Sequence, residues 1–337
     1  MESKPSIDAA ALAESIEKFH SHFHSLEAEV AKVLVGQSEV IRSALSAICA
    51  RGHVLLEGVP GLGKTLLIKS LSRALGLSFK RIQFTPDLMP SDVTGTQVLT
   101  EDGSGSRKFV FKEGPLFANI VLADEINRAT PKTQSALLEA MEEKQITVFD
   151  TTYQLPRPFF VLATQNPVEL EGTYPLPEAQ LDRFLLKVQV EPPTSQELKE
   201  ILSRTTGTTT AEIAPVFSPD SAHVEIEAMQ MMVRSVVIAD PMQEILVRIM
   251  AALTPSSQFA TPKVKQYVRF GPGPRGAQAA VLAAKVSALL DKRINVSFDD
   301  IRAVIKPALR HRMILNFQAE ADGITADTLL EEVRNAK

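Results

Sequence analysis

Short apolar runs alternate with segments of helical spacing between residues 50 and 190. Each run has the length of a buried strand and is followed by polar, glycine or proline residues. The runs lie at residues 54–56, 81–85, 120–123, 159–163 and 185–190. Because apolar strands that alternate with helices are typical of a parallel sheet with both faces covered, the pattern predicts an α/β fold.

Two helices are predicted before the first of these strands. The first begins near Ala9 and ends near Val33, and the second covers roughly residues 38–50 after a break at Gly36-Gln37. The apolar positions of the first helix recur every three or four residues, at Leu12, Ile16, Phe19, Phe23, Leu26 and Val30. One face of this helix is therefore expected to pack against another part of the protein.

Two segments interrupt the alternation of strands and helices. TGTQVLT and RKFVF, within residues 94–111, flank a stretch that contains Asp-Gly, which favours a tight turn. ITVFD and TYQLP, within residues 146–155, form a similar pair of short extended runs. We predict that both segments are β-hairpins inserted into the α/β fold.

The pattern changes after the Glu-Pro-Pro-Thr stretch at residues 191–194. No strand is predicted beyond it, and residues 205–220 form a polar linker. Helices are predicted at residues 195–205, 230–239, 242–253, 276–290, 298–309 and 326–335. The chain is thus expected to have an N-terminal helix on the core (1–35), an α/β domain (36–192) and a linker with a smaller all-α domain (193–337).

Composition and charge describe an ordinary soluble globular protein. The 337 residues are 45% hydrophobic and 23% charged, and the net charge of −4 gives no electrostatic sign of a nucleic-acid-binding protein. The single cysteine, Cys49, lies in an apolar run, so a buried structural thiol is expected. No signal peptide and no apolar run of about 20 residues is recognisable, so a cytoplasmic location is expected.

The stretch from Val54 to Thr65 carries the most specific chemistry. An apolar strand is followed by Gly58-x-x-x-x-Gly63-Lys64-Thr65 and then by a helix, which is the phosphate-binding loop pattern. Glycines let backbone N–H groups turn toward a phosphate, and the helix presents its positive end to the anion. The candidate nucleotide-binding residues are Gly58, Pro60, Gly61, Leu62, Gly63, Lys64, Thr65 and Leu66.

An acidic pair, Asp124-Glu125, directly follows the apolar run at residues 120–123. On its own such a pair often only begins a turn. Here it lies about 60 residues after Lys64, the spacing of the second half of a nucleotide hydrolase. We assign Asp124, together with the Thr65 hydroxyl, to Mg²⁺ and Glu125 to the attacking water.

Asn166 ends the apolar run that is expected beside the acidic pair. Ligands of open α/β sheets bind at the carboxyl ends of the strands, so the Asn166 amide is a candidate for orienting the water or the γ-phosphate. An ordinary Asn-Pro turn explains the residue about equally well.

Several ordered motifs resemble the MoxR family of AAA+ ATPases. They are GVPGLGKT (58–65), QFTPDLMPSDVTG (83–95), EGPLFANIVLADEINRA (113–129), LLEAMEE (137–143), ATQNP (163–167) and YPLPEAQLDRF (174–184), with a looser match at GPGPRGAQ (271–278). The resemblance implies a parallel-sheet AAA+ P-loop NTPase core with β-hairpin inserts, followed by an all-α lid domain. It also implies ATP and Mg²⁺ as cofactors.

The resemblance assigns further roles. Asn166 becomes the sensor-1 residue, Arg183 an arginine finger for a neighbouring subunit's γ-phosphate, and Arg275 the sensor-2 residue of the lid. Gly36-Gln37 resembles the segment against the adenine, and the two hairpins resemble inserts that face a ring pore. From local sequence alone, Arg183 could instead pair with the adjacent aspartate and Arg275 could cap a helix.

One position departs from the family pattern. The family often carries a serine before the Pro-Arg of sensor 2, whereas this chain has Gly273-Pro274-Arg275. The backbone before Arg275 is therefore less constrained, and whether Arg275 acts on its own nucleotide or on a neighbour's stays open.

Three functions are compatible with these features. The resemblance implies a ring-forming, hexameric, chaperone-like remodeller of partner proteins, among them proteins with a von Willebrand factor A domain, in metal or cofactor insertion. A helicase-type nucleic-acid motor would use the cluster Lys263, Lys265, Arg269 and Arg275, but the acidic balance and the absence of Trp argue against it. A nucleotide-gated binding module with little turnover would have no need of Glu125.

Overall fold

The computed structural model describes residues 9–59, 61–101, 107–167, 172–207 and 212–335. By their contacts these residues form two compact units, which we describe separately. The core unit comprises the described residues within 29–44 and 51–223, and the helical unit those within 1–28, 45–50 and 224–337. The predicted domain boundaries at residues 35 and 192 divide the chain differently and stay a prediction.

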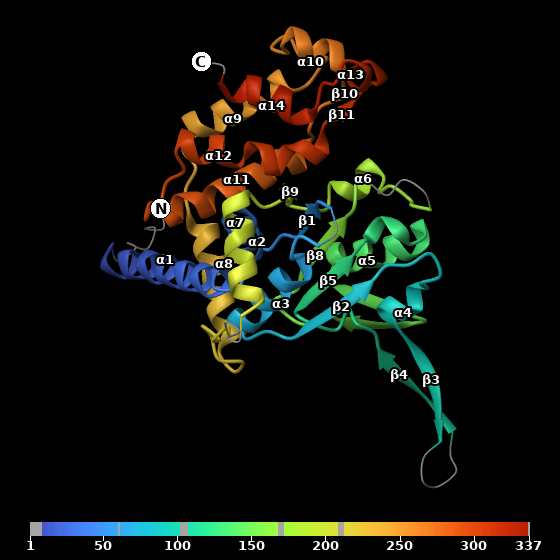
Figure 1. The fold of residues 1–337 in the computed structure, drawn as a ribbon. Coiled ribbons are helices and arrows are strands. Elements are labelled where there is room, and N and C mark those ends of the chain that lie inside the picture. Colours follow the sequence, from blue (N-terminus) through green and yellow to red (C-terminus); the bar gives the residue numbers. More distant parts are fainter. Residues whose placement is uncertain (1–8, 60, 102–106, 168–171, 208–211, 336–337) are drawn as a thin grey trace, which may run out of the picture. The chain divides into compact units, whose positions relative to one another are not determined.

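A five-stranded sheet forms the centre of the core unit (Figure 1). Its strands are β1 (Val54–Glu57), β2 (Phe79–Gln83), β5 (Ile120–Asp124), β8 (Phe160–Gln165) and β9 (Leu186–Gln189). They lie in the order β2-β5-β8-β1-β9, and every neighbouring pair is parallel. The predicted parallel sheet is therefore confirmed, with strands at the apolar runs that the sequence contains.

Alternate residues of these strands build a buried apolar layer. Leu55, Val121 and Val161 come from three neighbouring strands and pack in one cluster with Leu137 and Leu138 of α5. Because side chains alternate across a strand, one face of the sheet is committed to this cluster. The helices of the core unit are α3 (Lys64–Leu75), α4 (Pro90–Thr94), η1 (Ile126–Arg128), α5 (Pro131–Glu143), α6 (Glu178–Leu181) and α7 (Ser195–Thr205).

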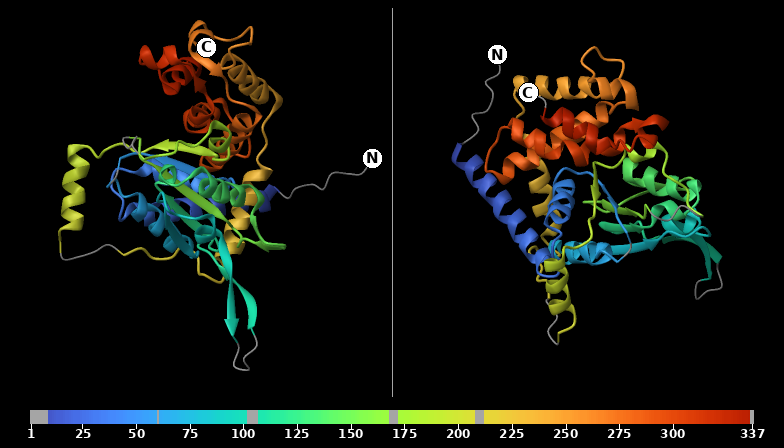
Figure 2. Two further views of the ribbon diagram at one scale, coloured as in Figure 1. Left: turned by 90° about the vertical axis from the view of Figure 1, so that its right-hand side faces the viewer. Right: turned by 45° about the horizontal axis from the view of Figure 1, so that its top comes forward.

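Both predicted hairpins are present. β3 (Gly95–Glu101) pairs with β4 (Arg107–Glu113), and β6 (Gln145–Val148) pairs with β7 (Thr151–Gln154). Figures 1 and 2 show the β3–β4 hairpin reaching away from the sheet. The hairpins contact each other through Phe111 and Tyr153, whose stacked rings lie 4.0 Å apart.

The helical unit is mostly α-helical, as predicted. Its elements are α8 (Ala222–Ser235), α9 (Asp240–Ala252), α10 (Pro262–Tyr267), β10 (Val268–Phe270), α11 (Pro274–Leu290), α12 (Phe298–Leu309), η2 (Arg310–Arg312), β11 (Ile314–Leu315), α13 (Phe317–Ala321) and α14 (Ala326–Asn335). Most of α1 (Ala9–Ala31) and the end of α2 (Ser38–Cys49) also belong to it. Burial raises the pKa of Cys49 to about 12, which fits the predicted structural thiol.

Several details of the helical unit differ from the sequence prediction, among them the short helices α10 and α13, which were not predicted. The short strands β10 and β11 pair antiparallel, although no strand was expected beyond residue 194. Runs of three and two residues are too short to show an alternating pattern. Helix α8 also begins at Ala222, well before the predicted start at residue 230, and ends at Ser235, before the predicted end at residue 239.

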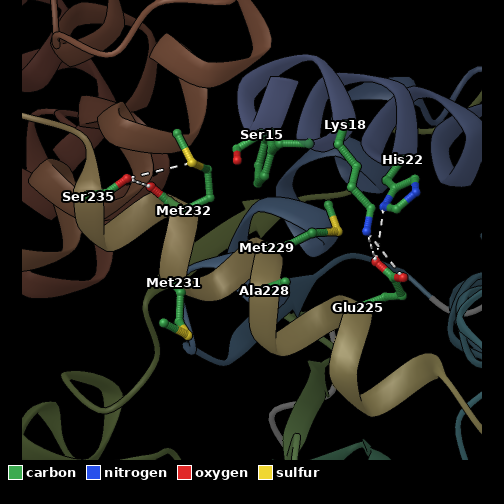
Figure 3. Close-up of a pocket in the computed structure, with 10 residues that line it drawn as sticks. Ser15, Lys18, His22, Glu225, Ala228, Met229, Met231, Met232 and Ser235 are labelled. Atoms are coloured by element: carbon green, nitrogen blue, oxygen red, sulfur yellow. Dashed lines mark hydrogen bonds and ion pairs between the residues drawn. The ribbon is translucent and has the colours of Figure 1, made fainter. Parts of the chain in front are cut away.

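A groove of about 450 Å³ lies between α1 and α8 within the helical unit (Figure 3). Methionines dominate its α8 side, among them Met229, Met231 and Met232. Lys18 and Glu225 form an ion pair of 2.9 Å at one end. The groove is thus largely apolar and lies outside the phosphate loop and the acidic pair.

Across the described residues, no helix has the length and apolar character needed to cross a membrane.

Candidate nucleotide-binding site

The phosphate loop connects β1 to α3. Gly58 follows the strand, and Gly61 and Gly63 have φ values of 85° and 76°, in the left-handed region that favours glycine. Leu62 lies between them and is half-buried, while Pro60 lies outside the described residues. The backbone therefore turns sharply over the positions that the sequence pattern marks.

Lys64, Thr65 and Leu66 form the first turn of α3. This turn has backbone N–H groups without helical acceptors, so it favours an anion. Lys64 and Thr65 are half-buried, whereas Leu66 is exposed. Two of the three predicted side chains thus lie in the sheltered part of the loop.

The Lys64 ammonium sits within the loop and near carboxylates. Its Nζ donates a hydrogen bond to the Gly58 carbonyl oxygen. Burial lowers the pKa of Lys64, and the charges of Asp124, Glu125 and Glu57 oppose that shift. A lysine in this position has an internal partner that it can exchange for an anionic ligand.

The acidic pair lies at the carboxyl end of β5. Asp124 is the last residue of the strand, and Glu125 has a left-handed φ of 56°. Thr164 of β8 joins the two residues: its hydroxyl donates to Asp124 Oδ1 at 2.6 Å and accepts the Glu125 N–H at 2.8 Å. The buried Thr164 hydroxyl therefore fixes both the side chain of Asp124 and the backbone of Glu125.

Two arginines and a glutamine contact the acidic pair. Arg81 donates to Asp124 Oδ2 from Nη2 at 2.7 Å and from Nε at 3.1 Å. Gln83 Nε2 lies 2.7 Å and Arg128 Nη1 3.0 Å from Glu125 Oε2. We call the set Arg81, Gln83, Asp124, Glu125, Arg128 and Thr164 the carboxylate cluster.

Sequence reasoning missed Arg81, Gln83, Arg128 and Thr164. The sequence of β2 by itself does not mark Arg81 or Gln83. In the structure β2 pairs with β5, and Gln83 lies opposite Asp124 in that register. That register is a property of the folded sheet and cannot be inferred from either strand alone.

Asn166 directly follows β8 and is buried. Since β8 pairs with β1 on one side and with β5 on the other, Asn166 lies at the sheet edge from which the phosphate loop and Asp124 also emerge. The strand that ends before Asn166 therefore lies beside the strand of the acidic pair, as predicted, and the role of Asn166 stays a prediction.

Arg183 follows α6 and pairs with Glu142 of α5 at 2.9 Å. Both side chains are partly exposed, so this ion pair contributes at most about 1 kcal/mol to stability. A contact of this strength can be exchanged for another anion. The guanidinium is thus held on the surface of the core unit.

Gly36 and Gln37 lie between α1 and α2. Gly36 has a φ of 73°, and a Cβ atom there would overlap the carboxylate of Glu197. Gln37 Nε2 lies 3.5 Å from the carbonyl oxygen of Glu191. The left-handed backbone therefore favours glycine at position 36, whereas the Glu197 carboxylate is the end of a flexible side chain that could move aside.

Arg275 lies in the first turn of α11, after the N-cap Gly273. It belongs to the helical unit, whereas the phosphate loop belongs to the core unit. The structure therefore fixes its place in the lid helix, and its partner in the site stays a prediction.

The donor set at the sheet edge fits Mg²⁺ in the presence of a nucleotide. The described residues contain no group of three or more His, Cys, Asp and Glu that could hold a metal by themselves. Mg²⁺ with a nucleotide needs less protein, because one carboxylate, a hydroxyl, phosphate oxygens and water complete its octahedral shell. Asp124 and Thr65 supply such a carboxylate and hydroxyl.

Two family models match the chain in the same order as its elements. The first, "ATPase family associated with various cellular activities (AAA)", matches residues 53–186, and the second, "AAA lid domain", matches residues 262–333. The first match spans the phosphate loop and the carboxylate cluster, and the second spans most of the later helices of the helical unit.

Similar proteins cover nearly the whole chain. The uncharacterised protein YeaC of Bacillus subtilis is 45% identical over 90% of this chain and 91% of its own length. Chaperone MoxR1 of Mycobacterium tuberculosis is 40% identical over 92% of this chain and 81% of its own length. A crystal structure from Cytophaga hutchinsonii, designated a candidate ATPase, superposes with a TM-score of 0.88 at 38% identity, over 97% of this chain and 98% of that one.

The parallel sheet, the phosphate loop and the following lid helices define a P-loop protein of the AAA+ class. Within this class, similarity to MoxR1 over 92% of this chain identifies the family. The chain belongs to the MoxR family of AAA+ ATPases.

Proposed function

We propose that this chain binds ATP with Mg²⁺ and hydrolyses it to ADP and phosphate. One observation carries the proposal: the Lys64 ammonium lies within the electrostatic reach of Asp124 and Glu125 at one edge of a parallel sheet. Phosphoryl transfer depends on positioning and on charge stabilisation, for which a cation, a metal-binding carboxylate and a second carboxylate suffice.

Binding begins at the loop. The N–H groups of the loop and of the first turn of α3 donate hydrogen bonds to the phosphate oxygens, while Lys64 leaves the Gly58 carbonyl for the β- and γ-oxygens. Thr65 and Asp124 hold the Mg²⁺, which neutralises charge that develops on the phosphates. Lys64 thus has an oxygen partner both before and after the nucleotide binds.

Hydrolysis in this proposal depends on Glu125 and Asn166. Glu125 polarises the attacking water and accepts its proton, and Asn166 orients that water or the γ-phosphate. The left-handed backbone at Glu125, held by its N–H bond to Thr164, keeps the carboxylate beside the metal ligand Asp124.

We extend the proposal to a ring of subunits, with a hexamer as the expected size. Arg183 then leaves Glu142 and presents its guanidinium to a neighbour's γ-phosphate, which gives a finger in trans. Arg275 senses the nucleotide from the lid helix.

The activity proposed for the ring is remodelling of partner proteins in the cytoplasm. Support comes from MoxR1, a relative named as a chaperone. Proteins with a von Willebrand factor A domain are the partner class that the family resemblance implies, with metal or cofactor insertion as the outcome. ATP turnover in this proposal drives the change in the partner.

A nucleic-acid motor is the less favoured function. Two of the cationic side chains that suggested it have local partners: Lys263 pairs with Glu332 at 2.8 Å, and Arg269 lies over the Phe270 ring at 5.3 Å. Since nucleic-acid binding depends on free cations, DNA binding that weakens steeply with salt would revive this function.

The proposal is tested with Glu125→Gln, measured by phosphate release and by binding of a fluorescent ATP analogue. Turnover should fall about 10²-fold or more while the analogue still binds, because only the proton acceptor is removed. Glu143→Gln makes the same chemical change at an exposed position of α5 and should keep full turnover. Full turnover in Glu125→Gln would remove this residue from the reaction.

A further inference from the structure

Each oxygen of the Asp124 carboxylate already has a partner. Oδ1 accepts the Thr164 hydroxyl at 2.6 Å, and Oδ2 accepts two N–H groups of Arg81 at 2.7 and 3.1 Å. Thr164 is buried in β8, whereas the Arg81 side chain is 46% exposed on β2. Oδ1 is therefore fixed, and Oδ2 is the oxygen whose partner can leave.

Arg81 also reaches the second carboxylate through Gln83. The same Nη2 group that contacts Asp124 lies 2.6 Å from Gln83 Oε1, and Gln83 Nε2 lies 2.7 Å from Glu125 Oε2. Hydrogen bonds thus run without interruption from Asp124 through Arg81 and Gln83 to Glu125. The side chains that extend from β2 hold both carboxylates in one arrangement.

A divalent cation at Asp124 disfavours this arrangement. Mg²⁺ binds carboxylate oxygens at about 2.0–2.1 Å, and its charge repels a guanidinium on the same oxygen whether the metal contacts it directly or through water. Because Oδ1 is engaged by Thr164, Arg81 and the metal compete for Oδ2. Departure of Arg81 would leave the Gln83 carbonyl without this donor, whereas Glu125 Oε2 would keep its contact with Arg128 at 3.0 Å.

We infer that Arg81 is a positioning residue that holds the metal-binding oxygen of Asp124 until Mg²⁺ and nucleotide arrive. This inference rests on the proposed Mg²⁺-dependent ATP binding. Arg81 supplies the cation that pairs with Asp124, whereas Arg128 pairs with Glu125. The pairing of Arg81 with Asp124 lowers the apparent affinity for Mg²⁺.

A simpler role for Arg81 is to strengthen the pairing of β2, an edge strand, with β5. That pairing already extends over the whole of β2, from Phe79 opposite Ile120 to Gln83 opposite Asp124. The two roles predict different measurements, because a purely structural contact has no effect on the Mg²⁺ requirement of a folded variant.

The experiment titrates Mg²⁺ against binding of a fluorescent ATP analogue to Arg81→Ala, without any assay of turnover. The Mg²⁺ concentration for half-maximal binding should fall about fivefold, the factor that corresponds to one partly exposed ion pair. Lys80→Ala removes the same charge from the neighbouring position, which points to the other face of β2, and should leave the requirement unchanged. Arg81→Met, which keeps the aliphatic stem, serves if the alanine variant unfolds.

An unchanged or increased Mg²⁺ requirement in the folded Arg81 variant would overturn the inference. So would an equal decrease in Lys80→Ala, which would indicate a general effect of net charge. If the wild-type protein binds no analogue at any Mg²⁺ concentration, the proposed function itself fails. If it binds with a Mg²⁺ requirement that Arg81→Ala does not alter, only the role of Arg81 fails.

Discussion

The phosphate loop and the carboxylate cluster lie at the same sheet edge but are built in different ways. The loop is one short stretch, and its own glycines and the Gly58 carbonyl set the position of Lys64. The cluster takes residues from β2, β5 and β8, which are far apart in sequence and meet only through strand register. Local sequence thus determines where a phosphate binds, and tertiary structure determines what surrounds it.

The difference predicts two kinds of sensitivity to substitution. Changes in the loop should act on nucleotide binding, because its turn is set largely by its own glycines, with the Gly58 N–H donating to the Gln165 carbonyl oxygen of β8. Changes in the cluster should act on turnover and on stability together, since its buried polar groups depend on one another. Substitutions that change nucleotide binding without turnover, or turnover without nucleotide binding, therefore test this difference between the loop and the cluster.

The largest effect is expected from Arg183→Ala. If the site includes a residue from another chain, this variant should lose about 10³-fold or more in turnover while it keeps its affinity for ATP. ATPase activity per subunit of the wild-type protein should also rise with protein concentration as rings form. Both are measured by phosphate release, with binding of a fluorescent analogue measured in parallel.

Glu142→Ala is the matched control for Arg183→Ala. It removes the partner of Arg183 at 2.9 Å and leaves the guanidinium free to act elsewhere, so turnover should not fall. Equal losses in both variants would mean that Arg183 acts only by holding α5. Turnover that is independent of concentration and of Arg183 would contradict a finger in trans.

A smaller effect is expected from Thr164→Val in the carboxylate cluster. The variant leaves Asp124 Oδ1 without its donor and the Glu125 N–H without its acceptor. We expect turnover to fall about tenfold and the free energy of unfolding to fall by about 1–3 kcal/mol, as for buried polar groups that lose their partners.

Thr147→Val makes the same substitution on the exposed β6–β7 hairpin and is its control. Urea unfolding and phosphate release should both remain close to wild type there. If Thr164→Val loses ATP affinity and keeps its turnover, the division between a binding loop and a reacting cluster is wrong.

The last prediction concerns His53, which directly precedes β1. Its Nδ1 accepts the Val161 N–H at 3.0 Å, and its Nε2 lies 3.2 Å from the Met141 carbonyl oxygen. Burial lowers the pKa of His53 to about 4, so the ring is neutral in the folded protein at pH 7. Between pH 6.5 and 4 the unfolded chain binds a proton that the folded chain does not.

Stability should therefore fall as the pH decreases through this window. Linkage gives a loss of about 2 kcal/mol in the free energy of unfolding between pH 7 and pH 5, measured by urea denaturation. In His53→Gln this contribution should disappear, so its stability should vary less between the two pH values. An equal dependence in both proteins would assign the effect to other groups.

The sequence was sufficient for the parts of the fold that have a local signal. The strand that carries Asp124, both hairpins and helix α12 lie where their patterns predict them, because burial and turn chemistry act over a few residues. Strands β10 and β11 were missed because they are too short to show a period.

The residues of the site also divide into those with a local sequence signal and those without one. Lys64, Asp124 and Glu125 were predicted from types and spacing, and they lie at one edge of the sheet. Arg81 and Thr164 were not predicted, since an arginine in an edge strand and a threonine in a central one have no pattern of their own. Their importance comes from the register that brings them to Asp124.

The β3–β4 hairpin also bears on how concentrated the protein can become before it aggregates. In the described structure these two strands form a sheet of their own, so each has an outer edge that can pair with a strand of another molecule. Leu99 and Phe109 face each other across it and are 54% and 70% exposed. Lys108 and Lys112 place positive charge along the β4 edge, so repulsion disfavours pairing between the β4 edges of two molecules, and added salt should weaken this effect.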